Sequence, residues 1–208
     1  MEVKDYFSLL ETVLSRSSKK LNSIRSEDFD KIIEHIQNLI CSSMCLIRSD
    51  FYTQAMFLGI TALEEAVKLE MCTLRGSSQP LSVGGKDPLL SHFSKHRLSV
   101  IPEILLIGDR PQKDIGRDKL ITILNKLQNG QIKISREECL YFESVASGTR
   151  TPKDMVHMND ALEFMLVCIE IIDDKFCGLS MKSNLLSESL DDFYNELLDK
   201  YLSLNIVK

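Results

Sequence analysis

The sequence contains no tryptophan, and only 7% of its residues are aromatic. It also lacks a long apolar run, since none approaches the roughly 18 residues that span a bilayer. The first residues, Met1 to Asp5, do not have the charged-then-apolar order of a secretory signal. These absences predict a cytoplasmic protein without a membrane partner.

An excess of basic residues is missing too. The chain has 25 Lys and Arg against 30 Asp and Glu, which gives a net charge of -5. A constitutive, non-specific nucleic-acid binder would be basic overall, so the composition argues against that class. The same composition is still compatible with a local basic cleft.

The cysteines form no CxxC pair and fall inside apolar helical patterns. This is typical of reduced core cysteines in a cytoplasmic protein rather than of a disulfide framework. There are six of them: Cys41, Cys45, Cys72, Cys139, Cys168 and Cys177.

Apolar residues recur at helical spacing along the chain, and no segment has a strand pattern. We therefore predict an all-α bundle, with one domain over 1–186, a core over about 26–178 and an acidic amphipathic helix over 187–208. The first helix should point Val3, Phe7, Leu10 and Leu14 inward. Predicted helices cover 2–22, 26–47, 51–74, 88–107 with a kink or break at Pro102, 119–128, 136–145, 152–177 and 187–204.

The predicted helix 51–74 is apolar nearly all round, which places it in the middle of the bundle. Asp50 stands at the expected N-cap. The helix also carries Glu64, Glu65 and Lys68. Buried charges need partners, so these groups either pair with neighbouring helices or line a cleft. The alternative is an intrahelical pair of Glu64 with Lys68 at a solvated edge.

Two histidines, His92 and His96, lie four positions apart and so share one helix face, with Lys95 and Arg97 beside them. This spacing could hold a metal, but Phe93 follows His92 where an HExxH motif requires glutamate. We predict no metal site. The alternative is that one histidine lies on the helix surface and the other binds a carboxylate.

Two arginines lie near possible proton-transfer groups. Arg136 precedes Tyr141 on one short helix, and Arg150 precedes His157 at the start of the last long helix of the core. The guanidinium group of arginine can form bidentate hydrogen bonds with a phosphate. A histidine or tyrosine can transfer a proton or orient a ribose hydroxyl. Such spacings also occur by chance.

Taken together, four segments resemble the AbiV abortive-infection family of the HEPN superfamily. They are AMFLGITALEEAVKLE at 55–70, HFSKHRLS at 92–99, REECLYFE at 136–143 and TPKDM at 151–155. Their order and approximate spacing match that family over roughly 29–177. The combination is specific, although each segment alone is not.

The resemblance implies a HEPN-like helical bundle with extra N- and C-terminal helices, which forms a homodimer with its site near the two-fold axis. It further implies a phage-resistance protein that acts as a toxin, namely a metal-independent endoribonuclease that needs no cofactor. RNA would be its substrate, and a phage-encoded protein would be its activator or target. The implied catalytic residues are Arg136, Tyr141, His96 and Glu64. The implied substrate-binding residues are Lys68, Glu65, His92 and Arg97, with Arg150 and His157 in reserve.

The sequence departs from the HEPN motif at one position, because Tyr141 stands where a histidine is usual. Proton transfer would then require His96, His92 or His157. If His96 is the base, activity should rise through its titration near neutral pH and be lost in His96→Ala. The alternative is a non-catalytic binding module that sequesters a phage protein and arrests translation or phage development.

Overall fold

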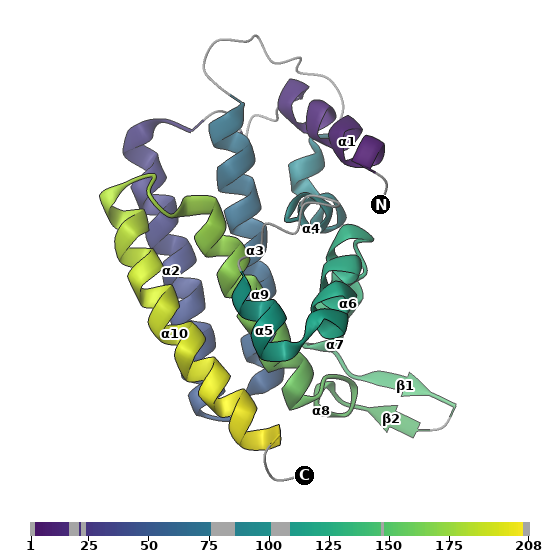
Figure 1. The fold of residues 1–208 in the computed structure, drawn as a ribbon. Helices are drawn as coiled ribbons and strands as arrows, with labels where there is room; N and C mark the ends of the chain where they lie inside the picture. Colours follow the sequence, from purple (N-terminus) through teal and green to yellow (C-terminus); the bar gives the residue numbers. More distant parts are fainter. Residues whose placement is uncertain are drawn as a thin grey trace.

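Four long helices form the body of the protein in its structure, a computed structural model (Figure 1). The structure describes residues 3–16, 21, 24–75, 86–100, 109–146 and 148–205. The long helices are α2 (Ser26–Arg48), α3 (Tyr52–Leu74), α9 (Met158–Phe176) and α10 (Met181–Asn205). Helix α3 packs on both α2 and α9, so it lies at the centre as predicted.

Shorter elements cover the remaining side of α3. Helices α4, α6 and α7 lie together on that side, with α1 across one end of the molecule and a β-hairpin projecting near the other (Figure 1). Their bounds are α1 (Val3–Ser15), the 3-10 helix η1 (Pro88–Leu90), α4 (His92–Leu98), α5 (Asp109–Ile115), α6 (Arg117–Gln128), α7 (Ile132–Glu138), β1 (Glu143–Val145), β2 (Gly148–Arg150) and α8 (Pro152–Met155). The predicted all-α class is confirmed, with ten α-helices in the described residues.

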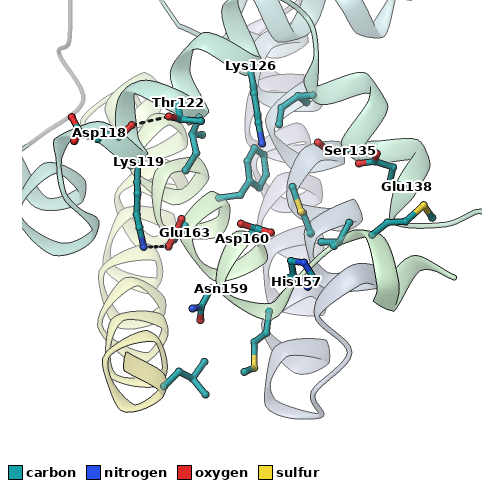
Figure 2. Close-up of a pocket in the computed structure, with 18 residues that line it drawn as sticks. Asp118, Lys119, Thr122, Lys126, Ser135, Glu138, His157, Asn159, Asp160 and Glu163 are labelled. Atoms are coloured by element: carbon teal, nitrogen blue, oxygen red, sulfur yellow. Dashed lines mark hydrogen bonds and ion pairs between the residues drawn. The ribbon is translucent and has the colours of Figure 1, made fainter. Parts of the chain in front are cut away.

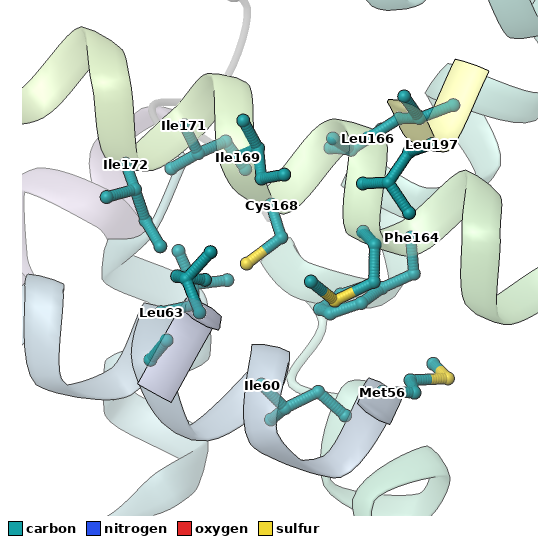
Figure 3. Close-up of a cluster of buried hydrophobic side chains, with 14 of the residues drawn as sticks. Met56, Ile60, Leu63, Phe164, Leu166, Cys168, Ile169, Ile171, Ile172 and Leu197 are labelled. Atoms are coloured by element: carbon teal, nitrogen blue, oxygen red, sulfur yellow. The ribbon is translucent and has the colours of Figure 1, made fainter. Parts of the chain in front are cut away.

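The core between α3 and α9 is built from aliphatic side chains with few aromatics (Figure 3). Gly59 allows the two helices to approach closely, because a Cβ at this position would lie 2.2 Å from the Met165 sulfur. The Cys168 thiol also donates to the Gly59 carbonyl at 3.3 Å. A side chain larger than glycine would therefore force the Met165 side chain to move from its place between the two helices.

Helix α10 contributes directly to this core. Leu190, Tyr194, Leu197 and Tyr201 are buried against the same cluster. The helix starts at Met181, six residues before the predicted position, and residues 206–208 of the predicted segment lie outside the described part. Its acidic face is solvated while its apolar face belongs to the main core.

Several local predictions were wrong. Asp50 does not cap α3, because it adopts a φ of 61° in the preceding turn and Phe51 takes the N-cap position. In α1, Phe7 is exposed while Tyr6 and Val13 are buried. Cys45 and Cys177 are exposed rather than in the core.

The segment after α7 also differs from the prediction. The helix predicted over 136–145 is instead α7, which begins at Ile132 and ends at Glu138. An antiparallel hairpin follows, with Glu143 opposite Arg150, where no strand was expected. Strands of three residues, most of them exposed, have too little alternation to produce a periodic signal.

Further predicted helices are shorter than expected, among them the first, which ends at Ser15 rather than at residue 22. Thr151 and Asp154 form a capping box at the start of α8, but this helix ends at Met155, and α9 starts afresh at Met158. The helix predicted over 88–107 is reduced to η1 and α4 within the described residues, and Pro102 lies outside them. Across the described segments, no helix is both long and apolar enough to cross a membrane.

Candidate functional site

Glu64 of α3 is the centre of a polar cluster in the otherwise apolar interior. Its side chain is only 3% exposed. It accepts a hydrogen bond from Lys95 Nζ at 2.6 Å, and its oxygens lie 2.8 Å from His96 Nε2 and 2.6 Å from His92 Nδ1. These three partners sit at positions i, i+3 and i+4 of α4, so one turn of that helix presents all of them to one carboxylate.

A buried ion pair holds the segment that leads into α4. Arg75, at the end of α3, contacts both oxygens of Asp87 at 2.8 and 3.1 Å, and both side chains are fully buried. Asp87 also accepts from the backbone N–H of Leu89, which caps η1. Since η1 runs almost directly into α4, this pair fixes the approach of His92 to Glu64.

Arg136 of α7 completes the cluster from a third helix. Its Nε lies 3.8 Å from Glu64 Oε1, within ion-pair range but without a hydrogen bond. Its guanidinium carbon lies 4.6 Å from the centre of the Phe57 ring, and the side chain is 23% exposed. The arginine is therefore held by a ring face and a carboxylate while part of it still reaches solvent.

The cluster keeps Glu64 ionised. Burial raises the pKa of Glu64, but the hydrogen bonds from His96 and Lys95 and the charge of Lys95 outweigh this effect and lower the pKa to about 2. One carboxylate thus stands beside the cations Lys95 and Arg136, so the site carries at least one excess positive charge. Such a site favours an anion such as a phosphate.

We expect acid to destabilise the protein through Glu64. Because its pKa is about 2 in the folded chain against an ordinary 4.5, its contribution is complete above pH 4.5 and is lost as the pH falls toward 2. The loss should reach about 3 kcal/mol, at ~1.4 kcal/mol per pH unit. Urea unfolding of wild type and Glu64→Gln across this range measures it. An identical pH slope in the two proteins would contradict the assignment.

The two histidines differ in access to solvent. His96 is fully buried, its Nδ1 has no hydrogen-bond partner among the described residues, and burial lowers its pKa although Glu64 opposes this. The His92 side chain is 41% exposed. With Nδ1 on Glu64, the other ring nitrogen of His92 is available to solvent. Of the two, only His92 can exchange a proton with a bound substrate.

The remaining predicted residues near this site do not join the cluster. Glu65 pairs with Lys68 on the same helix, so the proposed pair of Glu64 with Lys68 was wrong. Arg97 stacks over the Phe93 ring at 5.2 Å. Tyr141 is 63% exposed, and its side chain has no hydrogen bond or ion pair within the described segments.

Arg150 and His157, the two residues predicted in reserve, do not form one site. Arg150 binds Glu143 at 2.6 Å across the hairpin. His157 occupies the N-cap of α9 and lines a separate pocket (Figure 2). In the described part of the chain, no group of three His, Cys, Asp or Glu side chains is arranged to hold a metal ion.

Sequence reasoning missed three parts of the site. Lys95 was noted only as a flanking residue, although its position one turn after His92 places it on the same face. The Phe57 ring and the Arg75–Asp87 pair gave no signal, because each acts on a residue distant in the sequence. Only the fold brings them together.

The fold is a helical bundle in which basic residues from two neighbouring helices contact a buried glutamate. The chain matches the family model HEPN_AbiV, described as AbiV, over residues 27–172. No curated protein and no solved structure matches it. The match spans most of the chain, so the protein belongs to the AbiV family, and the predicted abortive-infection family is confirmed.

Proposed function

We propose that the protein is a metal-independent endoribonuclease toxin that is activated on phage infection and blocks translation. The observation that supports this most directly is the half-exposed His92 imidazole held by the buried Glu64 carboxylate beside Arg136. A carboxylate that binds one ring nitrogen orients the other for proton transfer. The basic surroundings suit a phosphodiester.

In the proposed reaction, His92 Nε2 accepts the proton of a ribose 2′-hydroxyl. The 2′-oxygen bonds to the adjacent phosphorus, and the bond from phosphorus to the 5′-oxygen breaks. The leaving 5′-oxygen takes up a proton from water, and His92 returns the proton it accepted to the solvent, so no net proton is gained or lost. The products are a 2′,3′-cyclic phosphate and a 5′-hydroxyl end. Glu64 stays ionised throughout, as its pKa of about 2 requires, and acts by orienting His92.

Arg136 stabilises the charge that accumulates on the phosphoryl oxygens. Such a contact is worth about 10²- to 10³-fold in rate. We therefore expect Arg136→Ala to lower RNA cleavage in a metal chelator by about that factor. The matched control is Arg117→Ala, an exposed arginine on α6, which should cleave at the wild-type rate. Equal rates for all three proteins would overturn the role of Arg136.

We also propose a homodimer that forms over the exposed apolar residues after α7. Leu140, Tyr141 and Phe142 are exposed together, with Phe142 at 70%. Apolar side chains grouped in this way are typical of an interaction surface. The double variant Tyr141→Ser, Phe142→Ser should shift the molar mass measured by light scattering from dimer to monomer. A wild type that is monomeric, or a variant that stays dimeric, would refute this interface.

A second candidate function is supported by the same exposed residues. Tyr141 has no polar partner within the described residues and replaces the usual histidine, so the surface could recognise a phage-encoded protein without cleaving RNA. In this case, cells should stop growing while their RNA stays intact. Tyr141→Ser, Phe142→Ser should then relieve the arrest, whereas Arg136→Ala should not.

A further inference from the structure

A pocket of about 840 Å³ lies between α6, α7 and the start of α9 (Figure 2). Its lining includes none of the side chains that contact Glu64. Its volume falls within the range of roughly 300–1,000 Å³ that is common for ligand pockets. The apolar part of its lining is rich in flexible side chains, including Met56, Met155 and Met158. Unbranched methionine side chains adapt to apolar groups of different shapes.

The polar part of the lining has unpaired groups of both signs. Figure 2 shows Lys126 reaching into the hollow from α6, and Asp160 and His157 from the start of α9. Lys126 and Asp160 are both exposed, and their side chains have no hydrogen bond or ion pair within the described part of the chain. By contrast, Lys119 is already bound to Glu163 at 2.5 Å.

The net charge of the lining indicates the charge of its ligand. The lining holds four carboxylates and two lysines, so its acidic groups outnumber its lysines by two. This favours a cationic ligand. Lys126 would repel a pure polycation, yet it can donate to a carbonyl oxygen. A polypeptide supplies basic side chains, apolar side chains and carbonyl oxygens together.

We propose that this pocket binds a short polypeptide segment of a partner protein, in which lysine or arginine side chains alternate with apolar ones. The basic side chains lie against Asp160 and Glu138. The apolar side chains pack on the methionines, and a backbone carbonyl accepts from Lys126. This proposal needs no RNA and does not depend on catalysis.

The pocket also shares two helices with the Glu64 cluster. Met56 and Ser135 line the pocket, while the next residues, Phe57 and Arg136, contact each other in the cluster. A segment bound in the pocket would therefore contact α3 and α7, the two helices that carry Phe57 and Arg136. If the proposed ribonuclease activity holds, occupancy should change the cleavage rate. This second consequence rests on that proposed function, whereas binding does not.

The test is fluorescence polarisation with a labelled synthetic peptide that alternates leucine and lysine. Three matched probes compete with it: a leucine–glutamate peptide, a serine–lysine peptide and spermine. We expect the leucine–lysine peptide to bind at least about tenfold more tightly than each of them, a difference of ~1.4 kcal/mol. No binding, or equal affinity for spermine or for the serine–lysine peptide, would overturn the proposal.

Variants locate the binding site. Asp160→Lys and, separately, Glu138→Lys should each weaken the leucine–lysine peptide by about tenfold or more, through repulsion at the pocket. The control is Asp192→Lys, which makes the same charge change at an exposed position of α10 outside the pocket lining and should leave affinity unchanged. Equal weakening by all three would show non-specific attraction and refute the site. The assay contains no RNA, so an inactive nuclease cannot affect it.

Discussion

Replacing His92 with alanine should lower the rate of RNA cleavage by about 10²- to 10⁴-fold, the usual contribution of a general acid or base. The reason is geometric, because His92 is the histidine of the cluster with a ring nitrogen that reaches solvent. His92→Gln should be equally inactive, since glutamine can donate to Glu64 but cannot transfer the proton. The rate is measured on a labelled RNA in chelator.

The control for this prediction is His35→Ala, an exposed histidine on α2 that is remote in sequence from the cluster. It should cleave RNA like wild type, and all three variants should keep the wild-type circular dichroism spectrum. A His92→Ala protein that retains activity within a few fold would remove His92 from proton transfer. His96→Ala answers a different question, because His96 is fully buried and its loss should lower stability.

Removing Glu64 should have the largest effect on stability. In Glu64→Ala, the buried Lys95 ammonium loses its partner and the buried His96 loses its acceptor. Breaking a buried ion pair by deleting one partner typically costs about 3–5 kcal/mol. We expect a loss of about this size in the free energy of unfolding, measured by urea denaturation.

The neighbouring Glu65 provides a matched control for this change. It pairs with Lys68 on the same helix, and both side chains are 24% exposed. A partly solvated pair of this kind contributes about 0–1 kcal/mol, so Glu65→Ala should change stability little. If Glu64→Ala and Glu65→Ala cost the same, the Glu64 cluster would not hold the helices together as described.

The main helices could be predicted from the sequence because each has a regular apolar pattern. The stripe of α2 and the all-round apolar surface of α3 define which helix lies inside. The presence of charged groups on a buried helix also indicated a polar site. These are local properties, and a 3.6-residue period is enough to detect them.

The partners of Glu64 could not be predicted in the same way. Helical spacing suggested Lys68, whereas the structure supplies His92, Lys95 and His96 from another helix. Which helix faces which depends on packing, and periodicity contains no information about it. The same limit explains why His96 was assigned the role of base, since the sequence could not distinguish the buried histidine from the exposed one.

The most direct test of the account is the chemistry of the RNA ends that the purified wild-type protein produces in chelator. The proposed reaction predicts 5′-hydroxyl ends, which polynucleotide kinase labels without prior phosphatase treatment, and 2′,3′-cyclic phosphates, all absent with His92→Ala. Products with 5′-phosphate ends would contradict the mechanism. RNA that stays intact with lysate from phage-infected cells added, while growth arrest persists in cells, would contradict the ribonuclease itself and favour the binding module.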